Sequence, residues 1–140
     1  MAPFDAAGSL NRKGTKVKLT TVGTPTPQIS ETTVTSAEAH RVLEYDWGGN
    51  NIRWELEALG GGTRLTLWHN IDRRFISMGA AGWHICFDVL DRFLNGTRVG
   101  RIVGGDAMKS GWQRLNAEYS KEFGVETPSW TPNVDRKSVV

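Results

Sequence analysis

Four side chains in the sequence are suited to recognise a small organic molecule. Tyrosine, tryptophan and histidine each join an apolar ring to one polar group, a combination that lines ligand pockets. The four residues are Tyr45, Trp54, His69 and Trp83. The aromatic rings could equally fill a protein core, and His69 could equally be a hydrogen-bonded residue at the rim of a sheet. As a general base, His69 would need a polar partner.

Other residues with reactive side chains fit ordinary structural roles. Cys86, the single cysteine, falls in an apolar helical stripe, where we expect it to be buried as a small hydrophobe. His84, Asp88 and Asp91 have helical spacing, but a metal ion would need further ligands from elsewhere in the chain. The glycines at 60–62 lack the lysine of a phosphate-binding loop. We therefore predict no metal, no cofactor and no catalytic residue.

The composition indicates one folded domain. The chain has 140 residues, of which 39% are hydrophobic and 23% are charged, and its formal net charge is +2. This balance gives no electrostatic footprint for nucleic acid or an anionic membrane surface, so we expect neither as a partner. No apolar run approaches the ~20 residues that span a bilayer, and the N-terminus lacks the pattern of a secretory signal. We expect a cytoplasmic protein.

Three segments in which polar and apolar residues alternate predict the main part of a sheet. They are residues 41–47, 52–57 and 63–69. Glycine-rich connections at 48–51 and 60–62 separate them, which favours two antiparallel hairpins.

If the apolar positions share one face, the register of both hairpins follows. The pairs expected in the first hairpin are Trp47–Ile52, Tyr45–Trp54 and Leu43–Leu56. The pairs expected in the second are Ile52–His69, Trp54–Leu67 and Leu56–Leu65. The opposite face then pairs Asp46 with Arg53 and Glu57 with Arg64, at about 0.2–1 kcal/mol for each pair. The same register sets Glu44 against Glu55.

The chain before these hairpins predicts two further strands. Residues 16–22 alternate, with Val17 and Leu19 on the apolar face, and residues 29–34 form a second short segment of this kind. We expect residues 1–15 to form a loop.

The apolar spacing then changes to that of helices. Residues 77–95 predict an amphipathic helix with Ser77 as its N-cap and Gly96 just beyond its end. Its apolar stripe comprises Trp83, Cys86, Phe87, Leu90, Phe93 and Leu94. A second helix is expected over residues 106–123, although Gly111 in its interior costs up to about 1 kcal/mol. Its stripe comprises Met108, Trp112, Leu115, Tyr119 and Phe123.

Several of these segments together resemble a known family. The runs VLEYDW, WELE, GGGTRLTLWH, GWHICFDVLDRFLNG and GWQRLNAEYSKEFG occur in this order. The sequence resembles the activator of Hsp90 ATPase homologue 1-like domains, including bacterial stand-alone members, of the START-like (SRPBCC) superfamily. The resemblance implies an α+β helix-grip fold, in which a curved antiparallel sheet wraps a long C-terminal helix. It places this START-like domain at residues 1–124, followed by a flexible tail at 125–140.

The resemblance also implies a function and a mode of association. Superfamily members hold apolar molecules between sheet and helix, so we expect a small hydrophobic ligand at Tyr45, Trp54, His69 and Trp83, without catalysis. One alternative is a chaperone-ATPase-activator type of interaction module, and a second is a polyketide cyclase- or hydrolase-like enzyme with His69 as the base. Family members begin with a strand and two helices that have no counterpart here. The sheet edge left open by that strand leads us to expect a homodimer.

Overall fold

A computed structural model describes residues 4–22 and 26–129 of the chain. Its internal contacts divide the chain into two compact units. The sheet unit consists of residues 4–21 and 27–71, and the helical unit contains residues 72–129 together with Val22 and Thr26. The predicted combination of an antiparallel sheet with helices is confirmed.

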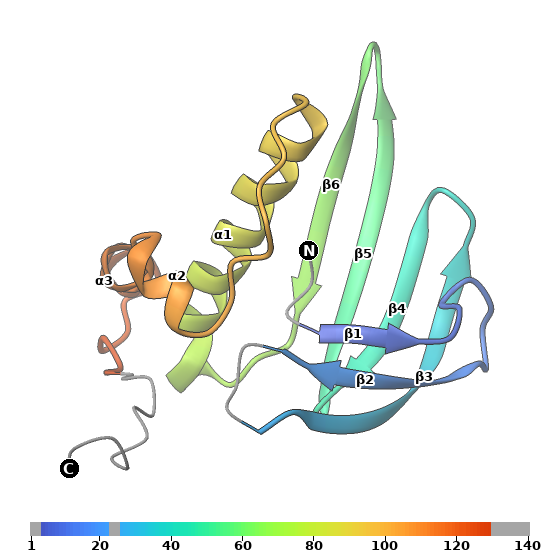
Figure 1. Cartoon of the computed structure of the whole chain (residues 1–140), viewed down its shortest axis with the longest axis horizontal. Coiled ribbons are helices and arrows are strands. Elements are labelled where there is room, and N and C mark those ends of the chain that lie inside the picture. Colours follow the sequence, from blue (N-terminus) through green and yellow to red (C-terminus); the bar gives the residue numbers. More distant parts are fainter. Residues whose placement is uncertain (1–3, 23–25, 130–140) are drawn as a thin grey trace. The chain divides into compact units, whose positions relative to one another are not determined.

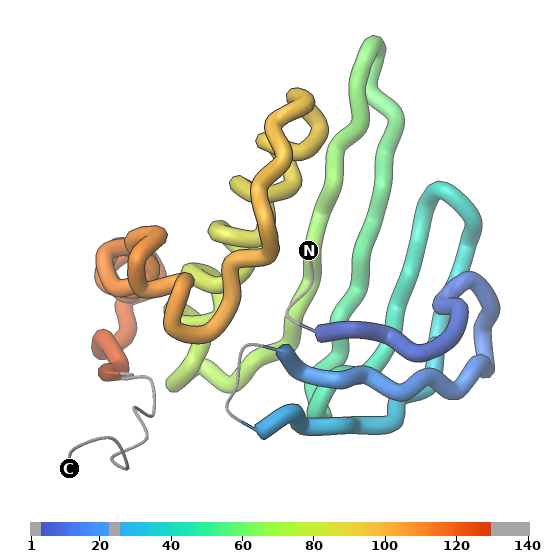
Figure 2. The backbone as a smooth tube through the Cα atoms, viewed as in Figure 1, coloured from blue at the N-terminus to red at the C-terminus, as the bar shows by residue number. Residues whose placement is uncertain are grey.

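The sheet unit is a six-stranded antiparallel meander in which each strand pairs with its neighbours in the sequence (Figure 1). Its strands are β1 (Phe4–Ala7), β2 (Lys16–Thr21), β3 (Gln28–Glu38), β4 (Val42–Trp47), β5 (Asn50–Leu59) and β6 (Gly62–His69). The register shifts between Val34 and Ser36, and the strand direction turns at this part of β3 (Figure 2). An irregularity of this kind bends a strand and increases its twist, so the sheet is curved.

The strand β1 corrects our expectation of a loop at the N-terminus. It pairs with β2 over Phe4–Ala7, and Phe4 is buried. Four residues are too few for an alternation to stand out in the sequence, since only Phe4 is a large apolar residue. Pairing with β2 therefore determines this strand more than its own pattern does.

One face of the sheet forms the core of this unit. Val17, Leu19, Val34 and Ile52 are at most 1% exposed. Strand pairing places all four on the same face as Tyr45. The predicted burial of Val17 and Leu19 is thus confirmed.

The predicted register is correct in one hairpin and wrong in the other. Every predicted pair between β5 and β6 is confirmed, including Ile52–His69 and Trp54–Leu67. Between β4 and β5 the prediction was wrong by two residues, because Tyr45 lies opposite Ile52 and Trp47 opposite Asn50. The connection is a two-residue turn at Gly48 and Gly49, with φ values of 62° and 84° that favour glycine. A shift of two residues keeps every side chain on its predicted face.

The helical unit contains η1 (Arg73–Phe75), α1 (Ile76–Leu94), α2 (Gly105–Lys109) and α3 (Trp112–Phe123). Ser77 is not the N-cap of α1, because the helix begins one residue earlier and Ser77 is fully buried. At the other end, Gly96 has a φ of 82°, as expected for a glycine beyond a helix terminus. The single helix expected over 106–123 is two helices, because Gly111 is left-handed (φ 84°) and separates α2 from α3.

The core of the helical unit lies between α1 and α3. Its buried members are Ala81, Ile85, Trp112 and Leu115. The apolar stripe predicted for α1 was partly wrong, because Phe93 and Leu94 are 57% and 73% exposed. Ala81, Ile85 and Val89 follow each other at four-residue intervals and are buried. The prediction favoured the largest side chains, whereas Ala81 and Ile85 of this narrower line pack in the core formed with α3.

The end of the described chain is held against α3. The Nδ2 atom of Asn116, which is 3% exposed, donates a hydrogen bond of 2.9 Å to the carbonyl of Pro128. Residues 130–140, the larger part of the expected flexible tail, lie outside the described residues. Within the described part of the chain, no helix is long and apolar enough to cross a membrane.

Candidate functional site

Tyr45 and Trp54 contact each other on the inner face of the sheet, which is the face that carries Val17, Leu19, Val34 and Ile52. The indole Nε1–H of Trp54 donates a hydrogen bond of 3.1 Å to the hydroxyl oxygen of Tyr45. Tyr45 is buried, and Trp54 is half-buried on the neighbouring strand. Two of the predicted ligand contacts therefore form one polar and aromatic pair.

Further rings extend this pair into a group that we call the aromatic cluster: Phe4, Tyr45, Trp47, Trp54 and His69. The Phe4 ring lies 5.9 Å from Tyr45, in an edge-to-face arrangement, and 5.0 Å from Trp47, centroid to centroid. The centroids of Trp47 and His69 are 6.2 Å apart. Contacts of this kind add to the stability gained from burying the rings alone. Residues from β1, β4, β5 and β6 thus meet on one face of the sheet.

Two members of the cluster were not among the predicted contacts. The alternation in β4 had already placed Trp47 on the inner face, so its sequence signal was present. Phe4 had no such signal, because the strand that carries it was not expected. In the structure Phe4 is 5% exposed and contacts both Tyr45 and Trp47.

Burial keeps the polar groups of the cluster uncharged. It raises the pKa of the Tyr45 hydroxyl above its ordinary value, and the hydrogen bond from Trp54 opposes this effect only in part. Burial also lowers the pKa of His69 below its ordinary value of 6.5. Near neutral pH the cluster therefore offers a phenol and a neutral imidazole among apolar rings.

The fourth predicted contact, Trp83, belongs to a different unit. It lies on α1 and is 9% exposed. The sheet unit by itself thus brings together Tyr45, Trp54 and His69, whereas Trp83 is a residue of the helical unit.

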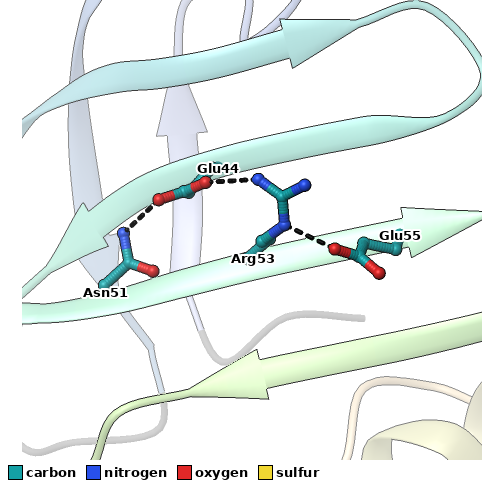
Figure 3. A network of polar contacts seen from close by, with 4 residues as sticks. All are labelled: Glu44, Asn51, Arg53 and Glu55. Atoms are coloured by element: carbon teal, nitrogen blue, oxygen red, sulfur yellow. Dashed lines mark hydrogen bonds and ion pairs between the residues drawn. The ribbon is translucent and has the colours of Figure 1, made fainter.

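The outer face of the sheet carries a charged network (Figure 3). The Arg53 guanidinium contacts Glu44 through Nη1 at 2.7 Å and Glu55 through Nε at 2.5 Å. Asn51 Nδ2 donates a further hydrogen bond of 3.0 Å to Glu44. This network replaces the predicted Asp46–Arg53 pair, since the register of β4 differs from the prediction. Its position opposite the aromatic cluster indicates a structural role.

Arg53 also resolves the expected repulsion between two glutamates. Glu44 and Glu55 were predicted to oppose each other, but Arg53 lies opposite Glu44 and binds both carboxylates. The hydrogen bond from Arg53 lowers the pKa of Glu55. On the same face, the predicted pair of Glu57 with Arg64 is confirmed at 3.1 Å.

The remaining reactive residues lie in the helical unit. His84 Nδ1 is 2.9 Å from the Tyr119 hydroxyl, and His84 Nε2 is 3.6 Å from Asp88 Oδ2. The contact with Tyr119 joins α1 to α3, whereas the contact with Asp88 lies within α1. Burial raises the pKa of Cys86, which disfavours its reactive thiolate form. Among the described residues, no three His, Cys, Asp or Glu side chains are grouped so that they could hold a metal ion.

Comparison with known proteins supports the fold. No protein-family model matches the sequence, and no curated protein matches it either. Among solved structures, the chain is similar to the solution NMR structure of the protein encoded by gene BPP1335 from Bordetella parapertussis. The TM-score is 0.57 and the sequence identity is 25%, over 90% of this chain and 74% of the other. This likeness agrees with a curved antiparallel sheet accompanied by helices.

Proposed function

We propose that the chain is a START-like domain that binds a small hydrophobic ligand against the aromatic cluster. The helix-grip fold that the resemblance implies is part of this proposal, and the contacts on which it rests are Tyr45, Trp54 and His69 of the sheet unit. The sequence resemblance to the activator of Hsp90 ATPase homologue 1-like domains motivates this arrangement.

The observation that carries the proposal is the composition of the inner sheet face. In the described strands, the positions that strand pairing assigns to the face of Tyr45 include no Asp, Glu, Lys or Arg. A charged ligand would find no counter-ion on this face. Burying apolar surface of a ligand there would contribute a favourable binding free energy of about 25 cal/mol per Å².

The polar atoms of the cluster suggest what the ligand carries besides apolar surface. The Tyr45 oxygen accepts from Trp54, so the Tyr45 hydroxyl hydrogen can be donated to a carbonyl or hydroxyl oxygen. Burial lowers the pKa of His69, so its ring is neutral near pH 7, and a neutral imidazole has one nitrogen that donates and one that accepts a hydrogen bond. We therefore favour an uncharged aromatic or aliphatic ligand that presents one or two oxygen atoms to these groups, such as a flavonoid, an aromatic polyketide or a fatty acid bound in its protonated form.

Tryptophan fluorescence tests the proposal with a matched pair of variants. Trp54→Ala removes a ring from the inner face, whereas Trp68→Ala removes one from the outer face, where Trp68 is 58% exposed. We expect saturable quenching by members of the three ligand classes. Loss of an aromatic contact should raise the dissociation constant by about tenfold in Trp54→Ala, and Trp68→Ala should stay within about twofold of the parent.

Circular dichroism of both variants controls for unfolding. A flat fluorescence response of the parent chain to a broad panel of these compounds would refute the proposal. Equal weakening of binding by the two folded variants would also refute it, because the ligand would then not distinguish the inner face from the outer one.

A further inference from the structure

The two edges of the sheet differ in how well they are protected against pairing. At one edge β1 has only four residues. At the other edge β6 has eight residues, and within the described chain no strand pairs with its outer side. The strand β6 contains no proline, no lysine and no register shift, three features that commonly protect an edge, and its single charged side chain is Arg64. The outer side of β6 is therefore suited to accept another strand.

The hydrogen bonds of the sheet identify which backbone groups of β6 face this edge. Asn70 N–H donates to the Asn51 carbonyl at 3.2 Å, whereas Leu56 N–H donates to Arg41 at 2.8 Å, on the β4 side. Because backbone direction alternates along an antiparallel strand, the even-numbered residues of β6 face β5. The N–H and C=O groups of the odd-numbered residues face outward. These residues are Thr63, Leu65 and Leu67, whereas the carbonyl of His69 already accepts a hydrogen bond of 2.9 Å from Ile71 N–H.

We propose that two copies of this chain pair antiparallel through β6 about a two-fold axis at Thr66. This register sets Leu65 of one copy opposite Leu67 of the other, with their outward backbone groups bonded. It also sets Arg64 opposite Trp68 of the second copy, and each of these pairs occurs twice. The inference does not depend on the ligand proposed above.

The side chains on the outer face of β6 favour a two-fold axis at Thr66 over an axis at an adjacent residue. Trp68 is 58% exposed, and Arg64 is 61% exposed at its side chain. A guanidinium over an indole ring is attractive, at about 0.5–1 kcal/mol for an exposed pair. An axis at Arg64 would instead bring two like charges together, and an axis at Leu65 or Leu67 would not pair Arg64 with Trp68.

Disulfide trapping tests this register in a Cys86→Ala background, which removes the single native thiol. In the proposed dimer the two Thr66 residues form a non-hydrogen-bonded pair with Cα atoms about 4.5 Å apart. That distance suits a disulfide. Thr66→Cys should therefore give a covalent dimer under mild oxidation.

The matched control places a cysteine on the same strand and face. The two Arg64 positions would be four residues out of register, about 13 Å apart along the strand. This exceeds the ~7 Å limit for a disulfide, so Arg64→Cys should remain mostly monomeric. Equal cross-linking of the two variants, or none with Thr66→Cys, would overturn the proposed register.

Sedimentation of the native chain tests the association itself. Pairing through eight edge residues buries a small area, so we expect a dimer that dissociates on dilution between about 1 mM and 10 µM. Thr66→Lys brings two like charges to the axis and should raise the dissociation constant by about tenfold. Thr20→Lys makes the same change on the outer face of β2 and should have little effect. A native chain that is monomeric throughout, or a dimer insensitive to Thr66→Lys, would overturn the inference.

Discussion

The Tyr45–Trp54 hydrogen bond shows how single residues give the inner face a directed hydrogen-bond donor without adding a charge. Trp54 lies diagonally across from Tyr45, since Leu43 is its direct neighbour on β4. The bond satisfies the indole donor and leaves the Tyr45 hydroxyl hydrogen for another acceptor. Burial keeps that hydroxyl protonated by raising its pKa. The pair therefore supplies a directed donor without introducing charge.

At this scale the alternation of residue types was sufficient to place three of the predicted contacts. Tyr45, Trp54 and His69 lie on one face because side chains alternate in direction along a strand, whatever the register. The same rule could not find Phe4, because its strand is too short to show an alternation. The pattern of a strand says nothing of Trp83, which lies on α1 in the helical unit.

The depressed pKa of His69 predicts how stability depends on pH. Burial disfavours the charged imidazolium in the folded state, so the unfolded chain binds more protons at pH values below about 6.5. The contribution of His69 to folding is therefore fully present above its unfolded pKa. This contribution is lost progressively as the pH falls from 6.5 towards the lower folded pKa.

Urea unfolding of the parent and His69→Gln between about pH 5 and pH 8 measures this contribution. The parent should lose stability on acidification more steeply than His69→Gln, which lacks the titrating group but retains the other histidines. An NMR titration of the folded chain gives the pKa directly. A folded His69 pKa at or above 6.5 would contradict the prediction.

At the scale of elements, turn geometry explains which strand pairs were predictable. The β5–β6 register followed from hydrophobic pairing alone, whereas the β4–β5 register also depended on the length of the glycine turn. The sequence contains Gly48, Gly49, Asn50 and Asn51 in a row, and only the backbone shows that Asn50 pairs with Trp47. The face on which a side chain lies is thus predicted more reliably than its partner on the neighbouring strand, because a register error of two residues leaves the face unchanged.

The division between α2 and α3 predicts opposite effects for two glycine substitutions. Gly111 is left-handed, with φ 84°, so Gly111→Ala should destabilise the chain by about 1–2 kcal/mol. Gly82 lies inside α1, and a Cβ atom there would meet nothing within 4 Å. Gly82→Ala should therefore stabilise by up to about 1 kcal/mol through helix propensity. Urea unfolding gives both values, and a Gly111→Ala variant at least as stable as the parent would contradict the assignment of Gly111 as the break between helices.

At the scale of the whole molecule, the chain forms two compact units of different kinds. The sheet unit is built mostly from pairing between strands adjacent in the sequence, and the helical unit is built around α1 and α3. Composition and periodicity were sufficient to predict both kinds of structure in their correct order. They could not predict Asn116 contacting Pro128, because a polar side chain bonded to a distant carbonyl has no periodic signal.

The Asn116–Pro128 hydrogen bond predicts how the chain responds to shortening. A chain ending at Val125 keeps the Val125 N–H bond to the Ser120 carbonyl, which closes α3, but lacks the acceptor of Asn116. Asn116 is buried, and no hydrogen-bond partner of its Oδ1 atom is found among the described residues, so loss of Pro128 leaves the whole amide unsatisfied. We expect this chain to be about 1–3 kcal/mol less stable than one ending at Ser129, measured by urea unfolding. Asn116→Ala should cost much less in the shorter chain than in the longer one. Equal costs in the two chains would show that Asn116 and Pro128 are not coupled, so that other contacts of residues 126–129 account for the difference.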